Sequence, residues 1–237
     1  MSEWLLIVVL TLGAGLSMPL GALLARIEHL HPQWLEQELR HSIIAFGGGA
    51  LLSAIALVLI PEGSAKLSIT ETAIYFALGG LAFMALDRLL DYLKSPASQL
   101  AAMLSDFIPE ALALGAAFAE GGSAGILLAG LIALQNLPEG FNAFREMNAA
   151  KAFKPSVIIL AFLAMAFLGP IAGLAGYFWL AAFPNAVGAI MVFAAGGILY
   201  LTFQDIAPQA KLEKHWGPPM GAVAGFLLGL IGQLLIH

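Results

Sequence analysis

Residues 126–144 read ILLAGLIALQNLPEGFNAF, and residues 105–110 read SDFIPE. The longer stretch is an apolar run of membrane-spanning character, yet Gln, Asn, Pro and Glu interrupt it near its centre. Hydrocarbon offers such groups no hydrogen-bonding partner, so a bare carboxylate there costs several kcal/mol. An ionisable residue inside a membrane span is therefore a functional-site hypothesis by default. The pattern predicts a helical membrane protein with a polar site inside it.

The composition of the whole chain is that of a membrane protein. Of its 237 residues, 60% are hydrophobic and 11% are charged, and the mean hydropathy is +0.91. A soluble domain is nearer half apolar and a quarter charged. There is no cysteine, which excludes disulfides and thiolate metal sites. The net charge of -5 and the lack of a basic stripe argue against nucleic acid as a partner.

Eight stretches are long and apolar enough to cross the hydrocarbon core, which takes about 20 residues. The expected fold is one all-α transmembrane domain over residues 1–237. The third and fourth stretches are the weakest by hydropathy because they hold several charges. Small residues cluster in AFGGGALLSA, FALGGLAFMA and FAAGGIL, which indicates close helix packing in a compact bundle. The expected helices cover about 4–26, 42–61, 71–93, 101–119, 123–145, 155–180, 187–209 and 218–236.

The basic residues predict an orientation. Cytoplasmic loops of membrane proteins carry an excess of Lys and Arg. Of the ten such residues, only Lys66 lies at an even-numbered connection between expected helices. The other nine lie at or near the odd-numbered connections, so both termini are expected outside. These nine are Arg26, Arg40, Arg88, Lys94, Arg145, Lys151, Lys154, Lys211 and Lys214.

Two weak internal repeats appear. Residues 46–61 read FGGGALLSAIALVLIP and residues 193–208 read FAAGGILYLTFQDIAP, each running from Phe to Pro through a glycine pair. DFIPEA (106–111) and QNLPEG (135–140) form the second pair. Both pairs lie in helices expected to run in opposite directions, as in transporters built from inverted repeats with a site near the midplane. The alternative is that glycine- and phenylalanine-rich helices match by chance.

The second repeat places oxygen donors on two neighbouring helices. In each motif, two polar residues four positions apart share one helix face, and a proline frees the backbone carbonyl one turn back. A divalent cation is the natural partner, because it neutralises carboxylates and accepts a mixed oxygen shell. The alternative is that the acids are protonated or lie in interfacial water. The expected donors are Asp106, Glu110, Gln135, Asn136 and Glu139, with the freed carbonyls of Ser105 and Leu134.

Other polar residues suggest weaker sites. Asp205 with Gln204, and Asp87, lie towards the expected cytoplasmic ends of their helices and would form an inner stepping site. Asp87 has the alternative of pairing with Arg88 or facing solvent. The first cytoplasmic loop, RIEHLHPQWLEQELRH (26–41), could hold a metal weakly through its histidines, but a solvated loop with a short amphipathic helix is the favoured interpretation.

These motifs carry a resemblance to a known family. The chain resembles the ZIP (Zrt-, Irt-like) family of divalent-metal transporters, of the bacterial type. That family typically has H-N-x-P-[ED]-G, followed by an LALG-like stretch, in helix 4 and H-[ED]-x-P-E-G in helix 5. Here the two helices read DFIPEALALGAAFAEG (106–121) and QNLPEGFNAF (135–144). The resemblance extends to IALVLIPEG (55–63), FALGGLAFMALDRLL (76–90) and FAAGGILYL (193–201), and so covers nearly the whole chain.

The resemblance implies site residues and departures from them. Asp106 and Gln135 stand where the family usually has histidine, Glu110 and Glu139 match its two acidic ligands, and Asn136 takes the acidic position beside Gln135. Phe107 replaces the usual Asn, and Ala111 the usual Gly. Gly169 precedes Pro170 where binuclear members often have an acid. A single site of Asp106, Glu110, Gln135 and Glu139 is therefore expected rather than a binuclear centre.

The resemblance also implies the function. The family has eight helices in a 3+2+3 inverted-repeat arrangement in the plasma (bacterial inner) membrane. We expect import of a divalent cation into the cytoplasm, without ATP, since no G-x-x-x-x-G-K-[ST] loop is present. Zinc is the first expectation, but a site without histidine also tolerates iron(II), manganese(II) or cadmium. No organic cofactor is expected, and the small-residue faces allow a homodimer without requiring one.

Three other functions compete with this interpretation. A membrane metalloenzyme would need a motif such as H-E-x-x-H, which the sequence lacks, so no enzyme is expected. A proton-coupled carrier of an organic solute could use the same carboxylates. A transport-dead or metal-sensing relative of the ZIP transporters is the main alternative, because Phe107 and Gly169 depart from the family pattern.

Overall fold

A computed structural model of the chain describes residues 2–27, 33–93, 98–119, 124–151, 153–180, 182–211 and 216–236. Within these ranges the fold is all-helical, with no β-strand. The helices are α1 (Glu3–Ile27), α2 (Gln33–Ala54), η2 (Ile55–Leu59), α3 (Ile60–Ser64), α4 (Ile69–Leu93), α5 (Ser98–Ala119), α6 (Ala124–Ala149), α7 (Pro155–Ala166), α8 (Leu168–Ala175), η3 (Gly176–Leu180), α9 (Pro184–Leu201), η4 (Thr202–Ile206), α10 (Ala207–Ala210) and α11 (Gly217–Ile236).

The observed helices match the expected stretches closely. Several consecutive elements continue one another and form a single expected stretch. The π-helical turns η2 and η4 join α-helices end to end, and η3 ends the α7–α8 segment, so α2–η2–α3, α7–α8–η3 and α9–η4–α10 each form one long rod. The largest difference is at α2. It begins at Gln33 and runs without interruption into the second stretch, which had been expected from about residue 42.

Seven of the rods are long and apolar enough to cross a membrane, over the residues described. The third and fourth expected stretches are among them. The eighth rod, α6, is not among them; it is 26 residues long, and Gln135, Asn136, Pro138 and Glu139 interrupt its apolar sequence. The polar motif that suggested a functional site is thus also what lowers the hydropathy of this helix. The chain is a multi-pass helical membrane protein.

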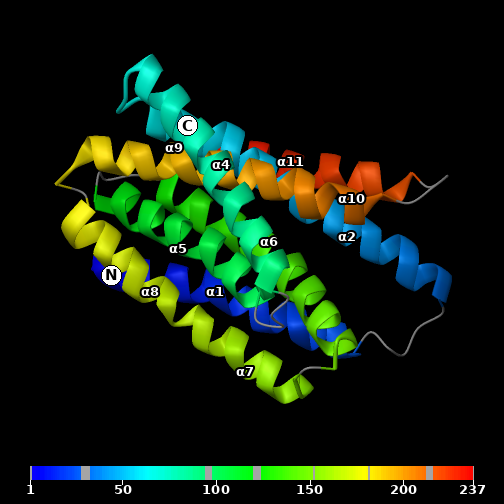
Figure 1. The fold of residues 1–237 in the computed structure, drawn as a ribbon. Coiled ribbons are helices and arrows are strands. Elements are labelled where there is room, and N and C mark those ends of the chain that lie inside the picture. Colours follow the sequence, from blue (N-terminus) through cyan, green and yellow to red (C-terminus); the bar gives the residue numbers. More distant parts are fainter. Residues whose placement is uncertain are drawn as a thin grey trace.

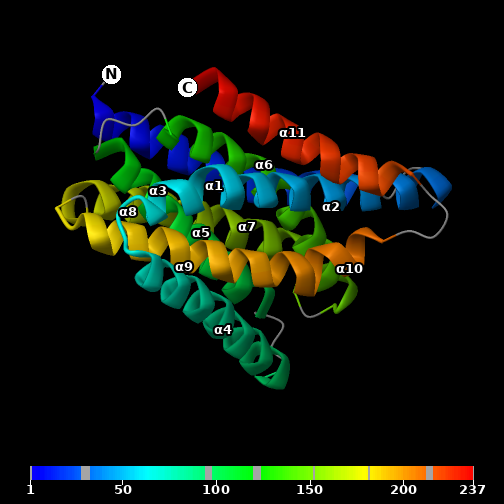
Figure 2. The same cartoon turned by 90° about the horizontal axis from the view of Figure 1, so that it is seen from above.

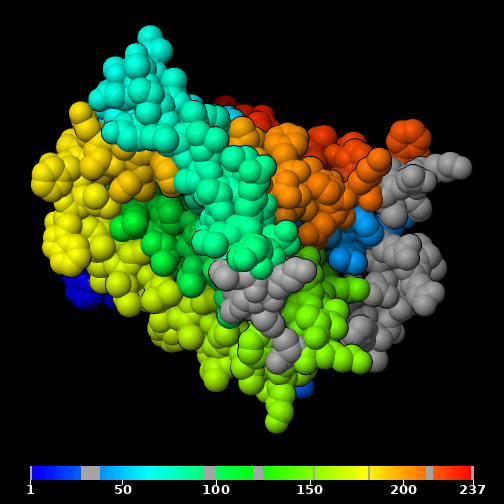
Figure 3. Space-filling model, viewed as in Figure 1, coloured from blue at the N-terminus to red at the C-terminus, as the bar shows by residue number. Residues whose placement is uncertain are grey.

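The rods pack side by side in a bundle (Figure 1). The start of α1 and the end of α11 lie at the same end of the bundle in both views (Figures 1 and 2), here called the termini end. The rods α2–η2–α3 and α9–η4–α10 run in opposite directions, and so do α5 and α6. Helix α4 packs mainly along α9 and stands out on the surface (Figure 3).

The two segments of the first repeat share a backbone distortion. In each segment a five-residue π-helical turn begins nine residues after the phenylalanine. The turn begins at Ile55 after Phe46, and at Thr202 after Phe193. In both, the residue before the proline donates its N–H to the carbonyl five positions back, Ile60 to Ile55 and Ala207 to Thr202. The proline removes one regular hydrogen bond, and the widened turn absorbs the change. Pro61 and Pro208 end both segments.

Glycines bring the rods into backbone contact, as the small-residue motifs predicted. A side chain added at Gly49 of α2 would overlap the carbonyl oxygen of Ala222 of α11, and one at Gly225 would overlap that of Phe46. The same reciprocal contact joins α9 to α4. There Gly196 meets the carbonyl oxygen of Phe76, and Gly79 meets that of Phe193. Gly49 and Gly196 stand at equivalent positions of the two repeated segments.

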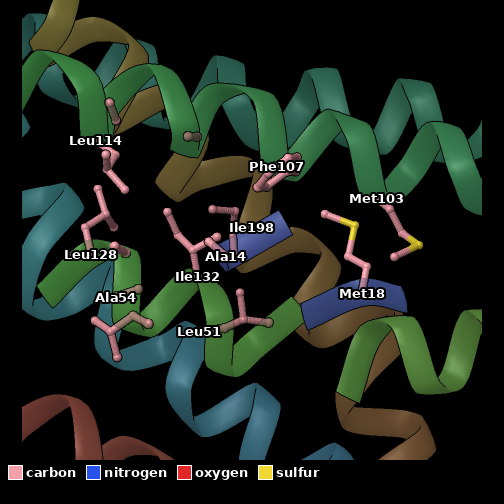
Figure 4. Packing of buried hydrophobic residues seen from close by; sticks show 14 of the residues in the cluster. Ala14, Met18, Leu51, Ala54, Met103, Phe107, Leu114, Leu128, Ile132 and Ile198 are labelled. Atoms are coloured by element: carbon pink, nitrogen blue, oxygen red, sulfur yellow. The ribbon is translucent and has the colours of Figure 1, made fainter. Parts of the chain in front are cut away.

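The bundle has a dry half and a polar half. Buried hydrophobic side chains of α1, α2, α5, α6 and α9 pack against one another (Figure 4), and towards the termini end the buried interior is mainly aliphatic. Towards the other end, the buried interior includes carboxylate and amide side chains. The aliphatic residues of the dry half include Ile7, Val58, Leu59, Leu114, Leu128, Ile132, Val187 and Met191.

Candidate metal centre

The polar half contains a cavity of about 90 Å³. A single ordered water needs only about 10–15 Å³ measured in this way, so the cavity can hold several water-sized occupants. Its walls come from α2, α5, α6 and the η4–α10 end of the α9 rod. Its polar lining consists of Asp106 of α5, Gln135, Glu139, Asn142 and Glu146 of α6, Asp205 of η4 and Gln209 of α10.

Four oxygen atoms of residues that line this cavity have no hydrogen-bond partner. They are Asp106 Oδ1, Gln135 Oε1, Asn142 Oδ1 and Gln209 Oε1, and each is buried from solvent. Buried polar atoms are normally hydrogen-bonded, and an unpaired one costs about 1–3 kcal/mol. All four atoms are hydrogen-bond acceptors without a proton of their own, unless Asp106 is protonated. Either water molecules or a cation could satisfy such acceptors.

Glu110 lies just outside the lining and sets the orientation of Gln135. Both residues are fully buried, at 0% and 2% exposure. Gln135 Nε2 donates to both carboxylate oxygens of Glu110, at 2.6 Å each. Because the amide nitrogen is directed at Glu110, the amide oxygen is left for the cavity. A carboxylate behind a ligand commonly fixes the ligand's orientation in this way.

The charges around the cavity are one-sided. Asp106, Glu139 and Asp205 lie close enough to repel one another, and Asp87 and then Glu146 add to the repulsion at Asp205. Of the described residues that line the cavity, none is Lys, Arg or His. Arg40 of α2 lies within electrostatic reach of Glu146, at the end remote from Asp106. A cation in the cavity would offset repulsion that the lining itself leaves uncompensated.

Three expected site residues lie away from the cavity. Asn136, 1% exposed, donates through Nδ2 to the carbonyl oxygen of Ala14 at 3.0 Å and so ties α6 to α1. Asp87 Oδ2 accepts a hydrogen bond of 2.9 Å from the Tyr200 hydroxyl. Gln204 is exposed beside that tyrosine. Of the expected inner stepping site, only Asp205 lines the cavity, but Asp87 lies within electrostatic reach of it.

The expected weak metal site of the first loop cannot be placed. It depends on His29 and His31, which lie outside the described residues. The freed carbonyls of Ser105 and Leu134 belong to helices α5 and α6, which continue through Pro109 and Pro138.

The two departures from the family pattern touch each other. The Phe107 ring is 1% exposed, and a Cβ added at Gly169 of α8 would lie 2.6 Å from its tip. A Cβ at Gly15 of α1 would lie 2.9 Å from the same ring. Phe107 therefore fills the space beside Gly169 with an apolar ring, and an acidic side chain at position 169 would collide with it.

The sequence analysis missed Glu146, Asn142 and Gln209. Gln135, Glu139, Asn142 and Glu146 follow one another by four, three and four residues, which is the spacing of a single helix face. That spacing was the available signal. Glu146 lies just beyond the expected end of the 123–145 span. An acid at that place usually indicates the boundary of a span and not a residue that lines a cavity inside it.

Within the part of the chain that the structure describes, no three His, Cys, Asp or Glu side chains converge as a ready-made metal site. The amide side chains of Gln135, Asn142 and Gln209 line the same cavity as the carboxylates. No protein-family model and no curated protein matches the chain. The arrangement can hold a hard or borderline divalent cation through mixed carboxylate, amide and water oxygens.

Proposed function

We propose that the chain is a ZIP-type transporter that carries a divalent transition-metal cation into the cytoplasm. The observation that carries the proposal is the set of four unpartnered oxygens in a carboxylate-lined cavity between α2, α5, α6 and η4. A membrane protein that only needed stability would fill this space with aliphatic side chains, as the other half of the bundle does. The resemblance of the α5 and α6 motifs to the ZIP pattern supports the same reading.

In this proposal the cation binds between α5 and α6. Asp106, Gln135 and Glu139 line the cavity and would supply the first ligands of the cation. Glu110 holds the Gln135 amide so that its oxygen points at the metal. Glu110 would become a direct ligand only if the Gln135 contact opened. Water completes the shell, which agrees with the absence of a convergent carboxylate cluster among the described residues.

The proposed fold has eight passes in a 3+2+3 inverted-repeat arrangement, with both termini outside. The matched π-helical turns of α2–η2–α3 and α9–η4–α10, in antiparallel rods, support the repeat. The reciprocal glycine contacts of α2 with α11 and of α9 with α4 support it as well. The length of α6 supports an eighth crossing despite its polar motif.

With the termini outside, the structure corresponds to a state closed to the exterior. Aliphatic side chains fill the outer half, and the cavity extends from Asp106 towards Glu146 near the cytoplasmic end of α6. Transport then requires one repeat block to move against α5 and α6, which opens the outer half and closes the inner one. Asp205, carried on η4, would move with its block relative to Glu139.

The donor set bears on metal choice. Zinc remains the first candidate by family resemblance, and carboxylates bind it. All the ligands that face the cavity are oxygens, so we include manganese(II), iron(II) and cadmium among the transported ions.

Phe107 favours a second candidate, a metal-binding relative that does not transport. Its ring blocks the region beside Gly169 and locks α5 against α1 and α8, which would hinder movement of α5 relative to either helix. In this case metal would bind in the cavity but would not cross the membrane.

Uptake into proteoliposomes tests the proposal. Purified protein is offered zinc, manganese, iron(II) and cadmium in turn, beside a Glu110→Ala/Glu139→Ala double variant. We expect saturable uptake of at least one metal that is lost in the double variant. Metal binding without uptake, in vesicles shown to be sealed, would favour the non-transporting relative. Absence of both binding and uptake would contradict the proposal.

A further inference from the structure

A second cavity lies between α2, the η4–α10 end of the α9 rod and the start of α11. It measures about 290 Å³, more than three times the volume of the carboxylate-lined cavity. Both α10 and α11 pack on α2, so α2 forms the floor of this space and the other two helices form its walls. We call it the apolar groove.

Small residues keep the apolar groove open. Gly48 and Gly49 of α2 lie on its floor, and a Cβ added at Gly48 would lie 3.0 Å from Ile206 Cγ2. Ala207 of α10 and Ala222 of α11 lie on its walls. Larger apolar side chains at the two alanines would fill the space, as such side chains fill the dry half of the bundle. The chain thus leaves a volume that an apolar group from outside can occupy.

The lining of the groove is apolar apart from one charge. Of the described residues that line it, Lys211 alone is charged and Thr202 is the only other polar one. The Thr202 hydroxyl donates to the carbonyl oxygen of Ile198 at 2.8 Å, so its proton already has an acceptor. Lys211 directly follows α10 and is exposed. An occupant that matches this lining has an apolar body and a negative charge at one end.

The groove is open towards lipid and ends near the membrane–water interface. Phe203, Ala207 and Pro219 of its lining are exposed, and exposed apolar side chains on a membrane-spanning rod face hydrocarbon chains. Trp216 directly precedes α11 and is 86% exposed. Exposed tryptophan and lysine side chains at helix ends are typical of the interface. The apolar part of the groove therefore lies at the depth of acyl chains, and Lys211 lies at the level of the headgroups.

We propose that the apolar groove is a binding site for one anionic phospholipid. Its acyl chain lies between α10 and α11, and its headgroup phosphate pairs with Lys211. Lysine near the membrane surface attracts anionic lipids, whereas a zwitterionic headgroup carries its own compensating positive charge. The inference goes beyond the proposed function and does not depend on it.

The bound lipid would also support the wall of the carboxylate-lined cavity. Ile206 lines both spaces, Asp205 before it lines only the cavity, and Ala207 after it lines only the groove. The η4–α10 segment is thus a single layer of chain between the two. An acyl chain packed against Ile206 would hold the η4 turn from the lipid side and so keep Asp205 at the cavity.

Native mass spectrometry of the full-length protein tests the proposal, because it counts both bound lipids and copies of the chain. Phosphatidylglycerol and phosphatidylcholine with the same acyl chains are titrated in turn. Lys211→Gln removes the charge, and Ala207→Phe fills the groove. The matched controls are Lys154→Gln, at an exposed lysine before α7, and Ala224→Phe, at an exposed alanine of α11, since neither residue lines the groove. Thermal unfolding checks that each variant is folded.

We expect the wild type to bind its first phosphatidylglycerol about fivefold more tightly than phosphatidylcholine, the factor that one lysine near a membrane surface contributes. Lys211→Gln should abolish this preference, Ala207→Phe should weaken the binding of both lipids, and the two controls should behave as the wild type. Equal affinity of the wild type for both lipids, or a preference that survives in Lys211→Gln, would overturn the proposal. A dimer that excludes lipid from the groove would overturn it as well. Each of these results would leave the proposed transport of metal standing.

Discussion

At the position where segment 193–208 places Asp205, segment 46–61 places Val58. Both residues are the fourth of a five-residue π-helical turn that ends before a proline. Val58 is 1% exposed and packs in the aliphatic core, whereas Asp205 lines the cavity. The residues just before them differ in the same way: Leu57 of the first segment is apolar, whereas Gln204 of the second is polar.

This difference shows that the shared backbone does not determine which side chains face the interior. The π-helical turn lies just before a proline in both segments. Side chains decide what the turn presents to the interior, so one half of the bundle is aliphatic and the other contains a carboxylate-lined cavity. A symmetric backbone with asymmetric contents is what a carrier needs if its two ends have different tasks.

Exchanging the two residues should produce the largest effect. Val58→Asp places an unpaired carboxylate in the aliphatic half, at a cost of about 3 kcal/mol, the usual penalty for an acid within a membrane span. Asp205→Val removes a charge that the cavity does not compensate and should leave the fold intact. Thermal unfolding in detergent should therefore show a large loss of stability for the first variant only. Equal stability of both would mean that the two halves do not differ as described.

Alanine at the equivalent glycines should cost less, and by similar amounts. A Cβ at Gly49 or Gly196 would overlap a backbone carbonyl of the packed neighbour, and such overpacking costs about 1–3 kcal/mol. Gly130 of α6 is the matched control, since nothing lies within 4 Å of a Cβ added there. Gly130→Ala should be neutral or raise stability by up to about 1 kcal/mol. A loss at only one of Gly49 and Gly196 would break the proposed symmetry of the two helix pairs.

Acidification should weaken metal binding through the polar half alone. Carboxylates must be deprotonated to bind a cation, so binding releases protons and affinity falls as the pH is lowered. For each proton released, the loss approaches about tenfold per pH unit. Titration of manganese binding over a pH series measures the slope, and Glu139→Gln should reduce it. A pH-independent affinity would show that the ion is held by the amides and the backbone.

Replacing Pro61 or Pro208 should have the smallest effect on stability. The two replacements should nevertheless differ in their effect on metal uptake. Pro208→Ala allows a regular helix to replace the π-helical turn, which would rotate Asp205 out of the cavity. Pro61→Ala would make the same change among aliphatic side chains. We expect both variants to stay within about 1 kcal/mol of the parent protein, within the range of ordinary substitutions. Uptake should fall only for Pro208→Ala, and an equal fall in both would argue that the turns act as hinges instead.

Much of the fold could be predicted from the sequence because a membrane leaves few choices. Long apolar runs have to be helices there, and the expected bounds agree with the observed rods to within a few residues except at Gln33. The π-helical turns could not be predicted, because proline permits a kink, a break or a widened turn alike. The Phe46 to Pro61 and Phe193 to Pro208 repeats became interpretable only when both showed the same turn.

The candidate site was predicted in part. Asp106, Gln135 and Glu139 were identified from their motifs, and the structure brings them to one cavity. Spacing alone could not show that Asn136 faces α1 or that Asp87 is held by Tyr200, because both depend on which helix packs beside them. Glu146 and Gln209 come together from residues 63 apart in the chain, a pairing that no local pattern reveals.

The most direct measurement uses the fact that the chain contains no cysteine. Ala102 lines the cavity, whereas Ala117, on the same helix, is buried in the dry half. Single Ala102→Cys and Ala117→Cys variants in sealed vesicles are treated with a membrane-impermeant thiol reagent from either side, with and without manganese. We predict labelling of Ala102→Cys only from the side opposite the termini, slowed by manganese unless Glu110 and Glu139 are also replaced by Gln, and no labelling of Ala117→Cys. Labelling that manganese does not affect, or that occurs only from the side of the termini, would contradict a cation site in this cavity.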